Sequence, residues 1–215
     1  LFDSTVNLYN TFIQIASNGN IHPENRIMPL FIITSLVKSH GEQVKSLIPN
    51  SIPLFLAIAA SQYIDADYES QDYSPIIINL FEELANVSNE DDFYEYLMNV
   101  ISQDANPATS FASLCAINGV DDILLNQFEQ NVEKIVGYLI SKLSLQYLPV
   151  AELSLIILNN LVVYISSAIS PLANKILEIA FQLAVSPEYL ISKKAIMLIS
   201  SILQEVESLE TSFIL

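Results

Sequence analysis

The sequence predicts an all-α protein in which about five helical hairpins stack into an α-α superhelix, and three observations lead to this prediction. Apolar residues recur with the spacing of a helix face along most of the 215 residues. Only 4 glycines are present, too few for the tight turns of a β-rich fold. At four places a polar residue followed by proline precedes an apolar run, which is a typical helix start.

Each helix is predicted from an apolar run between polar breaks. The first run ends near Asn18 and the second near His40. A third run covers residues 44–61, with Pro49 and Pro53 near its start or kinking it. After a polar stretch, further helices are predicted near residues 75–87, 91–103, 107–118, 122–143, 149–166, 171–185 and 188–206.

Four of these starts have a common mechanism. Ser74, Asn106, Ser170 and Ser186 each precede a proline. The polar side chain can accept hydrogen bonds from the free N–H groups of the first turn, and proline at the first helical position lacks a donor that would have had no partner. Many short helices joined by tight turns are therefore expected.

Every second predicted helix fits one repeating frame. The reference position of this frame is occupied by Leu36, Leu84, Ile117, Leu161 and Ile202. The position three residues earlier is occupied by Ile33, Phe81, Leu114, Leu158 and Ile199. All ten are apolar, the residues between them are polar or small, and the mean spacing is close to the ~40–47 residues of HEAT and armadillo repeats. We therefore interpret residues 1–215 as one segment of such a solenoid, cut from a longer array.

The strongest functional signal is charge. The formal net charge is −16, and fifteen Asp and Glu residues lie between Asp65 and Glu133, a stretch with no Lys, Arg or His before Lys134. Such a field attracts basic partners and repels nucleic acid. The candidate partner-binding residues are the clustered acids and one tyrosine among them: Asp65, Asp67, Tyr68, Glu69, Asp72, Asp91, Asp92, Asp121 and Asp122.

A second interpretation of these acids stays open. Asp91, Asp92, Asp121 and Asp122 are each expected to begin a helical run, where carboxylates interact favourably with the helix dipole. Acidic residues also keep an apolar protein in solution. The sequence does not decide between partner binding and these two roles.

Nothing in the sequence indicates catalysis, a cofactor or a metal. Cys115 is the single cysteine and lies in an apolar run, so we expect a buried, unreactive thiol. His22 and His40 border turns and lack the spacing of metal ligands. Glycine-rich phosphate loops, nucleophile elbows and HExxH motifs are missing from the sequence. We predict a binding protein and not an enzyme.

Mean hydropathy raises one alternative. Its value is +0.42, and no charged residue occurs from Leu153 to Asn174. The stretch is nearly long enough to cross a membrane, but polar residues interrupt it and flanking basic residues are scarce. A polytopic membrane protein is the less favoured reading, and we expect no membrane insertion.

Three stretches resemble the importin-β (karyopherin-β) family of nuclear transport receptors. They are GEQVKSLIPNSIPLFLAIAASQYIDADYESQDY, ISQDANPATSFASLCAINGVDD and VSPEYLISKKAIMLISSIL. The last carries Lys194 where the family often has a basic residue, whereas Ser110 and Ser154 stand near the corresponding earlier positions.

The resemblance implies a HEAT-repeat import receptor that moves between cytoplasm and nucleus. Such a receptor wraps basic cargo, responds to Ran-GTP and contacts nucleoporins. A HEAT/armadillo scaffold of another pathway, of the phosphatase-scaffold or vesicle-coat-adaptor type, is the main alternative and differs in its partner rather than in its fold.

Overall fold

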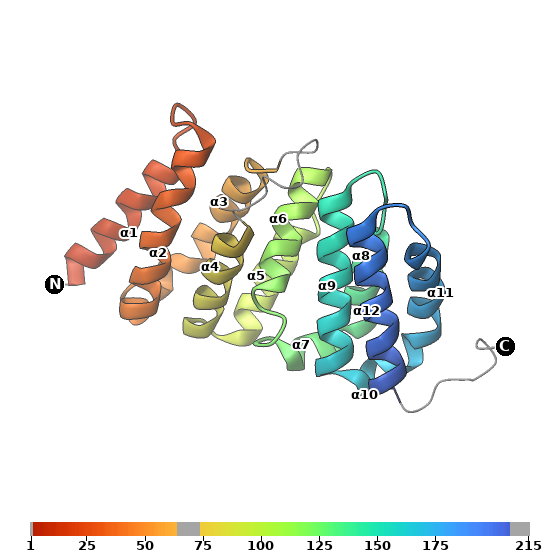
Figure 1. Ribbon diagram of the computed structural model, residues 1–215. Helices are drawn as coiled ribbons and strands as arrows, with labels where there is room; N and C mark the ends of the chain where they lie inside the picture. The colour runs from red at the N-terminus through yellow and green to blue at the C-terminus, as the bar shows by residue number, and fades with distance from the viewer. Residues whose placement is uncertain (1, 64–73, 207–215) are drawn as a thin grey trace. The chain divides into compact units, whose positions relative to one another are not determined.

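The protein is all-α throughout the part that the structure describes. This structure is a computed structural model in which residues 2–63 and 74–206 are described, and these form α-helices and short 3-10 helices without a strand. The chain divides into two compact units, Leu1–Leu124 and Leu125–Leu215. The prediction of an all-α fold is thereby confirmed (Figure 1).

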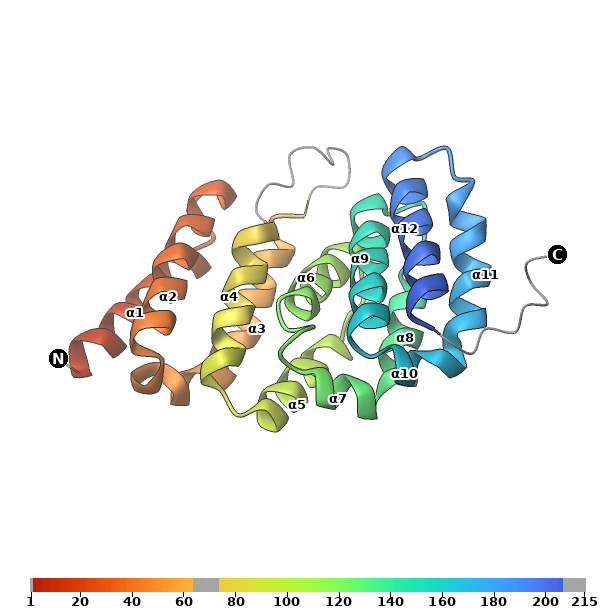
Figure 2. The same cartoon turned by 60° about the horizontal axis from the view of Figure 1, so that its bottom comes forward.

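The first unit contains six α-helices and one 3-10 helix among its described residues. They are α1 (Phe2–Ser17), α2 (Pro23–Val44), η1 (Lys45–Leu47), α3 (Ile48–Ala60), α4 (Ser74–Val87), α5 (Glu90–Ile101) and α6 (Pro107–Asn118). Consecutive helices contact each other as the pairs α1–α2, α3–α4 and α5–α6. The first helices of successive pairs also contact each other, α1 with α3 and α3 with α5. The second helices do the same, α2 with α4 and α4 with α6. Helix α3 packs in addition against α6 (Figure 2).

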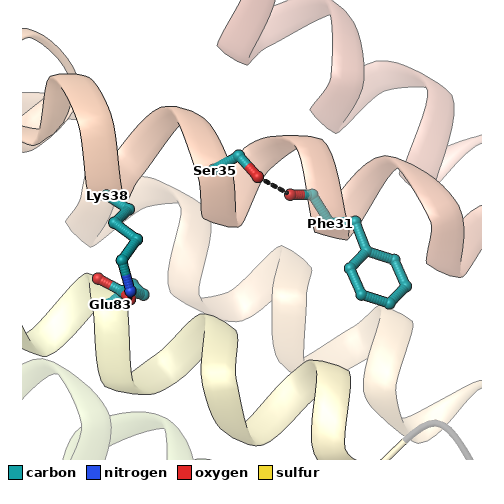
Figure 3. Close-up of polar contacts among 4 residues, drawn as sticks. All are labelled: Phe31, Ser35, Lys38 and Glu83. Carbon is teal, nitrogen blue, oxygen red and sulfur yellow. Dashed lines mark hydrogen bonds and ion pairs between the residues drawn. The ribbon is translucent and has the colours of Figure 1, made fainter.

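The second helices α2 and α4 run parallel to each other. Lys38 of α2 donates a hydrogen bond to the Glu83 carboxylate of α4 at 2.6 Å, as Figure 3 shows. One turn further along both helices, Gly41 lies against Val87. Because residue numbers rise together along the two contacts, the helices point the same way. This arrangement is the one expected when antiparallel pairs are placed side by side.

Helix α2 bends where the sequence predicts a stop. His40 has non-helical angles, φ −141° and ψ 29°, but the helix resumes and continues to Val44. Gly41 is needed directly after the bend, since a Cβ atom there would overlap the side chain of Val87. The predicted end of the second run is therefore a kink within one helix.

The start of α6 confirms one of the predicted caps. The Asn106 side chain accepts a hydrogen bond from the Thr109 amide at 3.0 Å. The Thr109 hydroxyl accepts one from the Asn106 amide at 3.1 Å, which completes a capping box. Pro107 is the first residue of the helix. Local sequence alone fixes this junction.

The second unit contains six α-helices and one 3-10 helix in its described part. They are α7 (Leu125–Gln130), α8 (Val132–Ser141), α9 (Leu148–Tyr164), α10 (Ser166–Ile169), η3 (Ser170–Leu172), α11 (Ala173–Ala184) and α12 (Tyr189–Glu205). Contacts join α8 to α9, α11 to α12 and α9 to α12. The second members of the two pairs thus lie side by side here as well.

One predicted helix and two predicted caps in this unit are wrong. The single helix predicted near 122–143 is two helices, because the backbone at Asn131 leaves helical angles with φ −118° and ψ 24°. Ser170 begins a 3-10 helix instead of capping an α-helix. Ser186 accepts a hydrogen bond from the Glu188 amide at 3.2 Å, but this forms a turn, and α12 begins only at Tyr189.

Helices α9 and α12 are parallel, like α2 and α4. Ser201 donates a hydrogen bond to the Asn159 side chain at 2.8 Å, across 42 residues of sequence. Two turns earlier along both helices, Glu152 of α9 interacts electrostatically with Lys194 and Lys193 of α12. Burial raises the pKa of the Glu152 carboxyl, and the two lysines partly oppose that shift. The predicted frame, which equates Leu161 with Ile202, comes within one residue of this register.

The repeating frame marks the core of both units. Eight of its ten positions are buried, and the other two, Leu36 and Ile199, are partly buried. Large side chains next to the frame positions are buried as well, among them Tyr9, Phe55 and Phe93. The apolar stripes that the sequence reveals are therefore the surfaces on which the helices pack.

Two stretches of the described residues meet the length and hydropathy of a membrane span. The helical stretch Asn25–Ala60 meets them directly, although 44% of its apolar window is buried and the His40 kink lies within it. Leu148–Tyr164 and Ser166–Ala184 meet them only if taken together, and these two segments are bent by 113°. Core helices pass the same test, so both stretches weigh little toward the membrane alternative.

Gly119 should not tolerate a side chain. A Cβ atom at this position would overlap the backbone carbonyl of Ile78 and crowd Phe81 of α4, although its φ of −78° suits any residue. We expect Gly119→Ala to lower the free energy of unfolding by about 1–3 kcal/mol, since backbone atoms cannot move aside easily. Urea denaturation followed by circular dichroism measures the change.

Gly137→Ala is the matched control. Gly137 lies inside α8, and a Cβ atom there meets nothing within 4 Å. Removing a helix-interior glycine should raise stability by roughly 0.5–1 kcal/mol. Equal effects of the two substitutions would contradict the close approach of α6 to α4.

Candidate protein-binding surface

The predicted partner-binding residues fall into three groups in the chain. The first group, Asp65, Asp67, Tyr68, Glu69 and Asp72, lies outside the described residues. The second is Asp91 and Asp92 in α5, and the third is Asp121 and Asp122 after α6.

Asp91 and Asp92 are exposed in the first turn of α5, next to the exposed Glu90. Asn89 caps the helix, because its side chain accepts a hydrogen bond from the Asp92 amide at 3.1 Å. The cap uses the backbone amide of Asp92 and leaves its side chain exposed. Acids in the first turn of a helix also interact favourably with the helix dipole, which is the structural role that the sequence left open for them.

Asp121 and Asp122 lie differently from what the sequence predicts. They were expected to begin a helix, but residues 119–124 form turns and α7 starts at Leu125. Asp121 is 4% exposed, whereas Asp122 is exposed. Of this pair, only Asp122 is exposed to solvent.

The acidic surface continues along α5 through Glu95, which was not among the predicted partner-binding residues, and through Tyr96, one of the aromatic residues interleaved with the acids in the sequence. Glu95 is exposed one turn after Asp91 and so lies on the same face of the helix. Tyr96, 44% exposed, lies one turn after Asp92. The i, i+4 spacing of these residues was a readable signal. We call Glu90, Asp91, Asp92, Glu95 and Tyr96 the acidic face of α5.

A small pocket adjoins this face. Its volume is about 120 Å³, and it is lined by Lys45, Ile48, Pro49, Ser88, Asn89, Asp92, Phe93 and Tyr96. Asp92 offers a carboxylate and Tyr96 an aromatic ring, the two groups that bind a lysine or arginine side chain best. Lys45 also lines the pocket, and its ammonium group would repel a cation there.

Negative charge is concentrated in the first unit. That unit carries sixteen Asp and Glu against three Lys and Arg, a net charge of −13. The second unit carries eight acids against five lysines, a net charge of −3. One of the three cations, Lys38, is held by Glu83, and the hydrogen bond raises the pKa of its ammonium group. The first unit therefore keeps a large excess of negative charge, and the exposed acids of α5 are part of it.

The residues with potential for chemistry are not gathered into a site. Within residues 2–63 and 74–206, no three His, Cys, Asp or Glu side chains are close enough together to hold a metal ion. His22 and His40 are exposed, at the start of α2 and at its kink. Cys115 is fully buried, as the sequence predicts, and burial raises the pKa of its thiol.

Comparison with known proteins adds no relative. No protein-family model matches the chain, and neither curated proteins nor solved structures give a match. Inferences about function therefore come from the sequence and the geometry described above.

The Cys115 thiol should be unreactive in the folded protein. Thiolate is the reactive form, and burial disfavours it. We expect Ellman's reagent to leave Cys115 unmodified under native conditions and to modify it fully in urea, as followed by absorbance. Rapid stoichiometric reaction of the native protein would contradict the burial of α6.

Proposed function

We propose that this chain is a HEAT/armadillo-type scaffold that binds a basic segment of another protein. The observation that carries the proposal is the net charge of −13 in the first unit, together with the exposed acids and tyrosine of α5. Parallel packing of α2 with α4 and of α9 with α12 supports the repeat architecture.

Within this proposal, the favoured role is that of a nuclear import receptor. The resemblance of three stretches to the importin-β family supports it, and it implies basic cargo, competition by Ran-GTP, contact with nucleoporins, and residence in cytoplasm and nucleus. A phosphatase scaffold or vesicle-coat adaptor would use the same fold with other partners. Binding rather than chemistry is the mechanism in each case, with no cofactor.

The acidic face of α5 would act mainly by attraction at a distance. An exposed ion pair contributes only about 0.2–1 kcal/mol, so affinity must come from several pairs formed together. Such a field also speeds encounter with a basic partner, and added salt weakens it. Tyr96 would add a cation–π contact to a cation that pairs with Asp92.

Neutralising part of the acidic face should weaken binding of a basic peptide. Asp91 and Glu95 are exposed on one side of α5, and the side chain that caps the helix is that of Asn89. We expect the double variant Asp91→Asn/Glu95→Gln to lose about fivefold in affinity for a nuclear-localisation-type peptide at low salt, the sum of two exposed pairs. Fluorescence anisotropy at low and moderate salt measures this.

A matched variant separates local from overall charge. Glu178 and Glu205 are exposed in the second unit, and Glu178→Gln/Glu205→Gln removes the same charge. It should bind within about twofold of the unchanged protein, because neither residue belongs to the acidic face of α5 and an exposed charge outside the binding surface contributes little. If both double variants bind as tightly as the unchanged protein, the α5 acids serve helix stability and solubility only.

A competition experiment separates the import receptor from other scaffolds. If the chain belongs to a receptor, Ran-GTP should displace the bound basic peptide, because it favours a different conformation. Ran-GDP provides the control, and release is followed by the same anisotropy signal. Retention of the peptide at saturating Ran-GTP would favour a scaffold of another pathway.

A further inference from the structure

We propose that Asn18, in the turn between α1 and α2, is a site of spontaneous deamidation that converts it to isoaspartate and aspartate. The reaction needs an asparagine whose side chain can be attacked by the backbone nitrogen of the next residue. Two of the four glycines of this chain, Gly19 and Gly119, directly follow an asparagine. Glycine has no Cβ atom, so its amide nitrogen is open to such an approach. The inference is independent of what the acidic face of α5 binds.

The chemistry uses only the chain, hydroxide and water. Hydroxide removes the proton of the Gly19 amide, and the nitrogen attacks Cγ, the side-chain carbonyl carbon of Asn18. A bond forms between this nitrogen and Cγ, the bond from Cγ to Nδ2 breaks, and ammonia leaves with a proton taken from water. The product is a cyclic succinimide. Water then opens the ring: cleavage between the nitrogen and Cγ gives aspartate, and cleavage between the nitrogen and the main-chain carbonyl carbon gives isoaspartate.

The turn at Asn18 provides the access that this attack requires. Asn18, Gly19 and Asn20 are all exposed, so hydroxide and water reach them. The Gly19 amide donates no backbone hydrogen bond to any described residue, which leaves its proton available to hydroxide. A Cβ atom on Gly19 would meet nothing within 4 Å, so no neighbouring group confines the backbone there.

A hydrogen bond within the turn also favours the reaction. The Asn20 amide donates to Oδ1 of Asn18 at 3.0 Å. When Cγ is attacked, negative charge develops on that oxygen, and an N–H group already directed at it stabilises the charge. The same bond folds the Asn18 side chain over the backbone that follows it.

Asn118 and Gly119 form the same pair of residues in a different setting. Asn118 is the last residue of α6, and the Gly119 amide donates to the Cys115 carbonyl at 3.1 Å. Gly119 is buried, and a Cβ atom on it would overlap the Ile78 carbonyl. Its nitrogen therefore has neither a free proton nor room to move toward the Asn118 side chain, and reaction there requires local unfolding.

Asn20 provides a second comparison within the same turn. It is exposed like Asn18, but Ile21 follows it. The branched side chain of Ile21 crowds its own amide nitrogen, and this amide donates to the Asn18 carbonyl at 3.0 Å. Of these two exposed asparagines, only Asn18 precedes an amide that is both unhindered and without a backbone hydrogen bond to the described residues.

The reaction would alter the junction of α1 and α2 in two ways. Either product adds a negative charge to a unit that already carries −13. In isoaspartate the main chain also runs through Cβ and Cγ, which lengthens the turn. The carbonyl that accepts from the Ile21 amide then belongs to a side-chain carboxylate and no longer to the main chain.

Peptide mapping by mass spectrometry tests the selectivity. The full chain is kept folded at mildly alkaline pH for several days and is then digested at acidic pH, where the reaction is slow. We expect the Asn18 peptide to acquire the mass of aspartate in place of asparagine, in two chromatographic forms. Asn118 should react more than about tenfold slower, because it depends on local opening of α6. Fragmentation of the peptide should show Asn20 unchanged.

One variant tests the attacking group. Gly19→Ala adds a methyl group that meets no other atom within 4 Å, and φ is not positive at this position, so the fold should be kept. The methyl group hinders the nitrogen, and we expect the reaction at Asn18 to slow several-fold. Gly137→Ala adds the same methyl group in α8 and should leave the rate at Asn18 unchanged. Urea denaturation checks that both variants are folded.

Unfolding the protein separates the effect of structure from that of sequence. In urea, Asn18 and Asn118 should react at similar rates, because each then precedes a glycine in an open chain. Equal rates in the folded protein would show that the turn does not select Asn18, and an unmodified Asn18 would refute the site. If Gly19→Ala reacts as fast as the unchanged protein, attack by the backbone nitrogen of residue 19 is refuted.

Discussion

The packing of each second helix against two neighbours is the constraint on which the rest of the structure depends. Helix α2 contacts both α1 and α4, and α9 contacts both α8 and α12. A helix with two such contacts must be apolar over much of its circumference, which explains why 52% of the residues are hydrophobic. Lys38 with Glu83, and Asn159 with Ser201, add polar contacts that fix the register of these parallel neighbours.

Much of this architecture could be predicted because helix periodicity and capping are local. Asn106, Pro107 and Thr109 form the cap of α6 from adjacent residues alone. The break at Asn131 was missed because apolar periodicity passes through it. There the Asn131 side chain donates to the Gln127 carbonyl at 2.9 Å, so it competes with helical hydrogen bonds. The presence of an asparagine did not by itself predict this break, because many asparagines of the chain lie inside helices.

The roles of the acidic residues could not be assigned from the sequence, because acids adjacent in the sequence lie in different environments in the structure. Glu82 is exposed, whereas Glu83 is buried and holds Lys38; Asp122 is exposed, whereas Asp121 is buried. Which member of each pair faces inward depends on helix phase and on the turn after α6. A pocket of about 220 Å³ in the first unit could not be predicted either, because its walls come from α3, α5 and α6, which only folding brings together.

The regular offset between second helices has a consequence for how such a chain can change in length. Contacts join α2 to α4 across 45 residues and α9 to α12 across 42. A tandem duplication of about that many codons would add one helix pair whose two faces already match its neighbours. The gene could therefore gain or lose a pair in frame, whereas a shorter insertion within a helix would rotate the later apolar residues of that helix out of their contacts.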